Sequence, residues 1–127
     1  MPARILIVDD DAVVRRVLRK LLEKPDVTDF TEAADGQQGL DIFREWRPDL
    51  AIVDMNMPKL NGLEAASAMS ALSPSTPIVL FTIHYSPQLT ALAQEHGIRE
   101  VVSKHEFARI LQIVDKLLGP ELPANQA

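Results

Sequence analysis

The feature that most constrains the fold of this chain is the alternation of five short apolar runs with five stretches of helical periodicity. The apolar runs are rich in Val, Ile and Leu and are bounded by polar residues or proline, which is typical of buried strands. The expected strands cover residues 5–8, 27–33, 50–53, 77–81 and 100–102. The run at 27–33 is more polar than the others, so we expect it at the outer edge of a sheet.

The stretches that follow the strands carry apolar residues at every third or fourth position, as amphipathic helices do. These expected helices cover residues 13–22, 35–47, 61–72, 86–96 and 107–118. Pro25, Pro48 and Pro74 stop three of them, because proline cannot continue a helix. Phe43 and Trp46 lie on the apolar side of the second helix, so we expect them to pack in the core.

Five successive strand–helix units favour a parallel sheet that is covered by helices on both faces. Right-handed crossovers leave few arrangements for such a sheet, and the flavodoxin-like strand order 2-1-3-4-5 is the commonest at this size. We therefore expect a doubly wound α/β fold. The length of 127 residues fits one domain, which we place at residues 4–118. Residues 119–127 are expected to be a C-terminal tail or a shortened linker.

The expected strands end in side chains that can do chemistry. Asp9 and Asp10 follow the first strand, and Asp54 follows the third, which is its neighbour in the expected order. Because the carboxyl ends of parallel strands meet at one edge of the sheet, these carboxylates should converge. Crowded carboxylates repel one another unless a cation joins them, and their oxygen ligands suit Mg²⁺. Thr82 and Lys104 end the next two strands and would add a hydroxyl and an ammonium group, which completes a set suited to phosphoryl transfer to a carboxylate.

Composition excludes several other classes of protein. The chain has no cysteine, which removes thiol nucleophiles, thiolate metal sites and disulfides. Its net charge of -5 disfavours direct binding to nucleic acid, because that binding depends on neutralising phosphates. The basic cluster Arg15, Arg16, Arg19 and Lys20 is expected to be a solvated helix face. No apolar run is long enough to span a membrane and residues 1–4 lack the layout of a signal peptide, so we expect a cytoplasmic protein.

The motifs at the strand ends resemble those of the receiver domains of two-component response regulators. The resemblance covers about residues 4–118 and rests on four motifs in order at specific intervals. They are Ile5-Leu6-Ile7-Val8-Asp9-Asp10, Asp54-Met55-Asn56-Met57-Pro58 with Gly62, Phe81-Thr82, and Gly97 to Lys104. The resemblance implies a CheY-like fold and a role in phosphorelay signalling.

The resemblance also implies a role for each acidic residue. Asp54 would accept a phosphoryl group from a sensor histidine kinase or a phosphotransfer protein. The carboxylates of Asp9, Asp10 and Asp54, together with the backbone carbonyl of Asn56, would hold Mg²⁺. The chain would thus be a signalling protein that catalyses only its own phosphorylation and dephosphorylation, rather than a metabolic enzyme.

The resemblance also implies that Thr82 and Lys104 respond to phosphorylation of Asp54. The resemblance implies that Thr82 bonds a phosphoryl oxygen and that Lys104 pairs with its charge. In the family, these contacts shift the face formed by the last two helices and the strand between them, which changes the affinity for a partner. Many members carry Tyr or Phe at the position of Val101, so a swinging aromatic switch is not available here.

Other positions also depart from the family pattern or modulate it. Ile83 stands where the family usually has a small residue, so we expect restricted access to the acceptor and slow phosphorylation by small donors such as acetyl phosphate. His105 follows Lys104 where a proline with a cis bond is common, and we expect a trans bond here. Asn56 and His84 occupy positions that adjust how fast the acyl phosphate hydrolyses.

Two alternatives remain open. Asp9-Asp10-Asp11-Ala12-Val13 also fits the opening motif of haloacid-dehalogenase-like phosphatases, with Asp9 as nucleophile and Asp11 as general acid and base. That family needs a further carboxylate pair late in the chain, and none follows residue 100. The other alternative is a receiver-like interaction module that works without phosphorylation. The departures from the family pattern at Ile83, Val101 and His105 keep this alternative open. Asp11 is otherwise expected to cap the first helix.

The partners are only partly specified by the sequence. We expect a kinase or phosphotransfer protein as the donor, and no direct contact with nucleic acid or with a membrane. The output partner is not identified by any sequence feature. The chain is expected to be a monomer or a weak homodimer.

Overall fold

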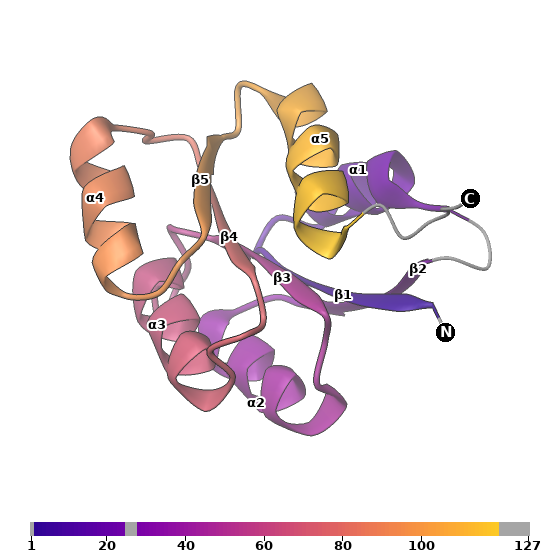
Figure 1. Ribbon diagram of the computed structural model, residues 1–127, viewed down its shortest axis with the longest axis horizontal. Coiled ribbons are helices and arrows are strands. Elements are labelled where there is room, and N and C mark those ends of the chain that lie inside the picture. The colour runs from indigo at the N-terminus through magenta and orange to yellow at the C-terminus, as the bar shows by residue number, and fades with distance from the viewer. Residues whose placement is uncertain (1, 25–27, 120–127) are drawn as a thin grey trace.

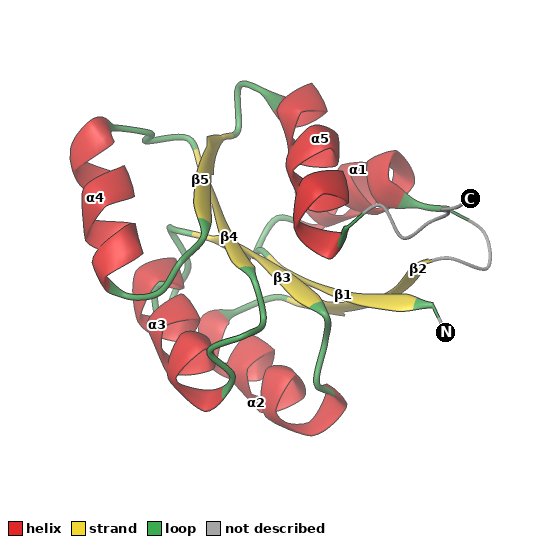
Figure 2. Cartoon of the chain, viewed as in Figure 1, coloured by secondary structure: helices red, strands yellow, loops and turns green. Residues whose placement is uncertain are grey.

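The computed structural model describes residues 2–24 and 28–119, which form one sheet between two layers of helices (Figure 1). In this part of the chain the strands are β1 (Ala3–Val8), β2 (Thr28–Ala33), β3 (Leu50–Asp54), β4 (Ile78–Thr82) and β5 (Glu100–Ser103). The helices are α1 (Ala12–Leu22), α2 (Gly36–Trp46), α3 (Gly62–Leu72), α4 (Pro87–Glu95) and α5 (Phe107–Leu118). Figure 2 shows strands and helices alternating along the chain, as the sequence predicts. Pro25, Val27 and residues 120–127, on which parts of the predictions rest, lie outside the described residues.

The sheet is parallel throughout and its order is β2-β1-β3-β4-β5, which confirms the predicted topology. β2 lies at one edge, as its more polar sequence indicates. Val8 of β1 lies opposite Val53 of β3, and Thr82 of β4 lies opposite Ser103 of β5. The residues at the carboxyl ends of these four strands therefore reach the same edge of the sheet.

Alternate residues of each strand face opposite layers of the molecule. Leu6 and Val8 pack with side chains of α2, α3 and α4, whereas Ile5 and Ile7 pack with those of α1 and α5. Figure 1 shows the same two groups of helices on opposite sides of the sheet. β3 and β4 are buried along their whole length, which explains why their sequences are continuously apolar until the last residue.

The predicted core positions of α2 are confirmed. Phe43 is 1% exposed, and Trp46 is partly buried against the same cluster. α5 has 12 residues and is the longest helix of the described part. Within residues 2–24 and 28–119, no helix has both the length and the apolar character that crossing a membrane requires.

Side-chain caps fix where four of the helices start. Oδ1 of Asp11 accepts a hydrogen bond from the backbone N–H of Val13 at 2.9 Å, which confirms its predicted capping role. Asp35, Asn61 and Ser86 cap α2, α3 and α4 in the same way. Such a cap stabilises a helix by about 1 kcal/mol relative to alanine. α1 therefore starts at a defined residue directly after the predicted acidic site.

The basic cluster of α1 is only partly the solvated face that the sequence predicts. Arg16, Arg19 and Lys20 are exposed. Arg15 is an exception, since its side chain is 18% exposed and its Nε donates to Oε1 of Glu32 at 2.9 Å. Nη1 of Arg19 donates to the other oxygen of Glu32 at 3.0 Å. Glu32 belongs to β2, so two arginines join α1 to the edge strand, and the prediction is wrong for Arg15.

This network makes the stability of the fold depend on pH. Burial raises the pKa of Glu32, but the hydrogen bonds and charges of Arg19 and Arg15 outweigh burial and lower the pKa from its ordinary 4.5. A lowered pKa adds stability above the unfolded value, and this stability is lost as the pH falls through the folded value. We expect Glu32→Gln to lower the free energy of unfolding by about 1 kcal/mol at pH 7. The difference from wild type, measured by urea unfolding, should shrink below pH 4.5.

Glu45→Gln is the matched control. Glu45 is exposed on α2 and makes no ion pair with any residue that the structure describes. Its substitution should change the free energy of unfolding by less than about 0.5 kcal/mol. Equal losses for the two variants, or a loss in Glu32→Gln that persists at low pH, would contradict the ionic role of Glu32.

Candidate functional site

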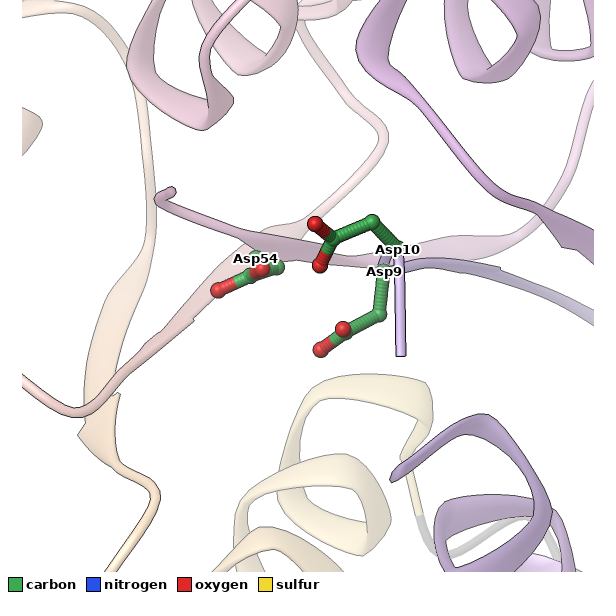
Figure 3. A group of neighbouring side chains, drawn as sticks. All are labelled: Asp9, Asp10 and Asp54. Carbon is green, nitrogen blue, oxygen red and sulfur yellow. The ribbon is translucent and has the colours of Figure 1, made fainter. Parts of the chain in front are cut away.

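Three carboxylates gather at the carboxyl edge of the sheet. Asp9 and Asp10 follow β1 and Asp54 ends β3, and one oxygen from each lies within 4.8 Å of the others. In Figure 3 the side chains of Asp9 and Asp10 extend from the end of β1 toward the side on which Asp54 lies. Asp9 and Asp54 are 1% and 4% exposed, whereas Asp10 is exposed. The predicted convergence of these side chains is confirmed, while their chemical roles stay a prediction.

Lys104 supplies a positive charge to this group. Its Nζ lies 2.8 Å from Oδ2 of Asp9 and 3.1 Å from Oδ1 of Asp54. Its backbone N–H donates to the carbonyl of Thr82 at 2.7 Å, and its Nζ lies 5.8 Å from the centre of the Phe81 ring. The residue is therefore anchored on β4 while its ammonium group reaches the ends of β1 and β3. The predicted reach of Lys104 into the acidic group is confirmed.

The crowding of charges shifts two pKa values. Burial raises the pKa of Asp54, and the negative charge of Asp9 raises it further. Lys104 and the backbone N–H of Asn56 oppose this rise without cancelling it. Burial lowers the pKa of Lys104, but its hydrogen bonds to Asp9 and Asp54 outweigh burial and raise the pKa overall. The lysine is therefore held in its charged form by the two buried carboxylates.

The two oxygens of Asp54 have different surroundings. Oδ1 contacts Nζ of Lys104 and accepts from the backbone N–H of Asn56 at 3.4 Å. Among the described residues, no donor reaches Oδ2 of Asp54. Both oxygens of Asp9 are engaged, since Oδ1 accepts from the N–H of Asp11 at 2.9 Å and Oδ2 accepts from Lys104. Oδ2 of Asp54 is thus a buried acceptor atom that is free to bind a cation or to attack an electrophile.

Thr82 brings a hydroxyl group to the same edge. It is 0% exposed, and it follows Phe81, which lies opposite Asp54 in the pairing of β3 and β4. Its Oγ1 accepts from the backbone N–H of His84 at 3.0 Å, so the hydroxyl proton is available for donation. The side chain of His84 is exposed, and its predicted effect on hydrolysis stays a prediction.

A tight turn after β3 holds the backbone of Asn56 beside Asp54. The N–H of Gly62 donates to the carbonyl of Met55 at 2.8 Å. A Cβ atom at Gly62 would collide with the backbone of Asp54 and Met55, so only glycine permits this approach. The side chain of Asn56 is exposed, while its N–H points to Asp54. The predicted metal contact of its carbonyl stays a prediction.

The positions that depart from the family pattern have distinct surroundings. Ile83 is 52% exposed at the end of β4. Val101 is 4% exposed and packs in the cluster beneath α2, α3 and α4, so it fills core space. The peptide bond between Lys104 and His105 is trans, as expected.

The donor atoms of the acidic group fit Mg²⁺. All of its ligand atoms are carboxylate oxygens, and Mg²⁺ takes one or two carboxylates together with water and phosphate oxygens. Three carboxylates and the ammonium group of Lys104 leave an excess of two negative charges. A divalent cation would balance this excess. The arrangement can therefore hold a hard cation next to a nucleophilic oxygen.

Arg15 is the residue near this group that sequence analysis missed. Its Nη1 donates to the backbone carbonyl of Asp9 at 2.6 Å, while its Nε binds Glu32. The only signal in the sequence is that Arg15 lies one turn after the capping residue Asp11. No local pattern joins Arg15 to Asp9 or to the edge strand.

Several known proteins resemble this chain along most of its length. Protein CcdB of Bacillus subtilis is 31% identical over 117 residues, which cover 91% of this chain and 98% of CcdB. The nitrate/nitrite response regulator protein NarL of Escherichia coli is 38% identical over 94 residues, which cover 72% of this chain but only 44% of NarL. A two-component response regulator of the LuxR family from Aurantimonas has 30% identity and a TM-score of 0.83, over 93% of this chain and 86% of that one.

The family profile described as the response regulator receiver domain matches residues 5–115. The matched range contains the three carboxylates, Thr82 and Lys104. Receiver domains generally act in signalling rather than as catalysts, and the comparisons do not favour a haloacid-dehalogenase-like phosphatase. The sequence match, the sheet order and the acidic group agree, and the chain belongs to the receiver domain family of two-component response regulators.

Proposed function

We propose that this chain receives a phosphoryl group on Asp54, in an Mg²⁺-dependent reaction, from a phosphohistidine of a sensor histidine kinase or phosphotransfer protein. The observation that carries this proposal is the buried carboxylate of Asp54, whose Oδ2 has no donor among the described residues. This carboxylate lies beside Asp9, Asp10 and the ammonium group of Lys104. The membership of the family supports the same role.

The proposed step forms one bond and breaks one bond. Oδ2 of Asp54 attacks phosphorus, the N–P bond of the donor breaks, and the imidazole nitrogen leaves with the electron pair. Nζ of Lys104, 3.1 Å from the other oxygen of Asp54, is placed to pair with a phosphoryl oxygen. The hydroxyl proton of Thr82, which no acceptor among the described residues takes up, can be donated to another.

We propose that the carboxylates of Asp9, Asp10 and Asp54 hold the cation together with the backbone carbonyl of Asn56. When bound, Mg²⁺ would offset the charge of these groups and of the phosphoryl oxygens. Asp10 is exposed and its side chain makes no hydrogen bond or ion pair with any described residue. Its carboxylate is therefore free to turn to a ligand without losing an existing partner.

The output of the proposed reaction is a change in the face made by α4, β5 and α5. Thr82 lies at the start of the loop to α4, and Lys104 lies at the start of the loop to α5. New contacts of these two side chains would act on both loops. Because Val101 is a buried aliphatic residue, the change would travel through the loops rather than through a rotating ring at that position.

We also propose the boundaries of the domain, its location and its oligomeric state. Residues 4–118 form the receiver domain. The net charge of -5 favours binding to proteins rather than directly to nucleic acid or anionic membranes. We propose a cytoplasmic location. A monomer or weak homodimer is the expected state.

Asp54 should be the single site of phosphorylation. We expect the chain to gain the mass of one phosphoryl group on incubation with Mg²⁺ and a phosphorylated histidine kinase, with the group mapped to the peptide that contains Asp54. Asp54→Asn should abolish the gain, because an amide is a poor nucleophile. Asp11→Asn is the matched control, since asparagine preserves the helix cap.

The same experiment distinguishes the proposed phosphorylation from the alternative of an interaction module that works without it. A wild-type chain that gains no mass from the kinase or from acetyl phosphate, and whose amide spectrum does not change with a beryllofluoride mimic, would act as an interaction module only. A phosphoryl group that still appears in Asp54→Asn but not in Asp9→Asn would instead favour the phosphatase-like chemistry.

Mg²⁺ affinity should depend on Asp10. We expect Asp10→Asn to weaken Mg²⁺ binding by more than roughly 10-fold, a loss that changes outside the ligand shell already produce. Calorimetric titration with MgCl₂ measures the affinity, and Asp11→Asn should bind Mg²⁺ as the wild type does. An unchanged affinity in Asp10→Asn would remove this residue from the ligand set.

Access to Asp54 should depend on Ile83. We expect Ile83→Ala to react severalfold faster with acetyl phosphate, because the smaller side chain opens the approach from the end of β4. Ile83 is 52% exposed, so its truncation should leave the core intact. Leu92→Ala, which removes an exposed apolar side chain of α4, is the control. An Ile83→Ala variant that reacts no faster would show that the side chain does not restrict access.

A further inference from the structure

The backbone carbonyl of Asp9 lies just beyond the end of β1, where pairing with β3 has stopped at Val8 and Val53. No backbone N–H among the described residues donates to this carbonyl, and its donor is Nη1 of Arg15 at 2.6 Å. Asp9 is 1% exposed. Loss of the guanidinium group would therefore leave a buried carbonyl without a partner, which is costly.

Arg15 is itself held in place. Its Nε donates to Oε1 of Glu32 at 2.9 Å, and the side chains of Arg15 and Glu32 are 18% and 30% exposed. The other oxygen of Glu32 accepts from Arg19 at 3.0 Å. A planar guanidinium group that binds two partners through different nitrogens has a fixed orientation. Arg15 thus bridges the end of β1 and the edge strand β2.

The carbonyl that Arg15 binds belongs to the peptide unit between Asp9 and Asp10. Because a peptide unit is planar, the direction of this carbonyl restricts ψ of Asp9 and φ of Asp10. The side chain of Asp10 has no hydrogen-bond partner among the described residues, so the direction of its carboxylate depends on the backbone. Arg15 therefore binds the peptide unit that joins two residues of the acidic group, without a hydrogen bond to either carboxylate.

We infer that Arg15, braced by Glu32, is a positioning residue that holds the peptide between Asp9 and Asp10 in the orientation that binds Mg²⁺. This inference rests on the proposed function, because it takes both aspartates as ligands. A positive charge near a cation site weakens cation binding by repulsion. Charge alone therefore predicts tighter Mg²⁺ binding when Arg15 is removed, whereas positioning predicts weaker binding.

The test is the affinity of Arg15→Gln for Mg²⁺, measured by calorimetric titration and by the rise in melting temperature with MgCl₂. We expect the affinity to fall roughly 10-fold, as it does when outer groups that orient metal ligands are changed. Arg19→Gln is the matched control, since it removes the same charge from the same helix and breaks the other bond to Glu32. Among the described residues, Arg19 makes no hydrogen bond with Asp9, so Arg19→Gln should bind Mg²⁺ as the wild type does.

Two more variants keep the test decisive if Arg15→Gln folds poorly. Arg15→Lys keeps the charge, but one ammonium group cannot reproduce the two-sided bridge, so it should not restore the affinity. Glu32→Gln leaves Arg15 in place without its ionic brace and should lose part of the affinity. Circular dichroism confirms that each variant is folded before titration.

The outcomes separate this inference from the proposed function. Unchanged or tighter Mg²⁺ binding in Arg15→Gln and Glu32→Gln would overturn the inference and leave the proposed function intact. Equal losses in Arg15→Gln and Arg19→Gln would also overturn it, because they would reflect a general loosening of α1. A wild-type chain that binds no Mg²⁺ would overturn both.

Discussion

The crowding of three negative charges at the carboxyl edge of a buried sheet is the constraint on which the rest of the structure depends. Two of these carboxylates, Asp9 and Asp54, are almost inaccessible to water, so their charge must be stabilised by protein groups. The groups that do so come from different elements, with Lys104 beyond β5 and the N–H of Asn56 in the turn after β3. The charges are therefore balanced only when the sheet has its full order, and fold and site are specified together.

The described protein groups neutralise and hydrogen-bond the three carboxylates only in part. Lys104 offsets one of three charges, Asp10 has no partner among the described residues, and one oxygen of Asp54 is free of donors there. A site in which every oxygen was satisfied would gain little from a cation or a phosphoryl group. The backbone N–H of Lys104 binds the carbonyl of Thr82, while its ammonium group contacts Asp9 and Asp54. The same residue thus joins the acidic group to the ends of β4 and β5, the strands that precede α4 and α5.

The fold could be predicted from the sequence because each element carries its own signal. β3 and β4 are continuously apolar, the caps mark helix starts, and strand order then brings Asp9 and Asp54 together. Pairings of distant side chains away from the carboxyl ends of the strands could not be predicted, since they depend on rotamers and on how far apart elements lie. Arg15 shows this limit, because helical periodicity groups it with exposed neighbours and says nothing of Glu32, 17 residues away on the edge strand. The chemical roles of the site residues come from the resemblance, not from periodicity.

The edge strand explains why Arg15 and the site are connected at all. β2 has unpaired backbone groups along its outer side, and exposed edges of this kind are commonly guarded by charged side chains. Glu32 places such a charge on β2, where Arg15 and Arg19 cover it from α1. Arg15 is long enough to use its second nitrogen on the carbonyl of Asp9, one residue beyond β1. The ion pairs that join α1 to the edge strand therefore include the guanidinium group that also binds the backbone between two carboxylates, so the attachment of α1 and the geometry of the site share one residue.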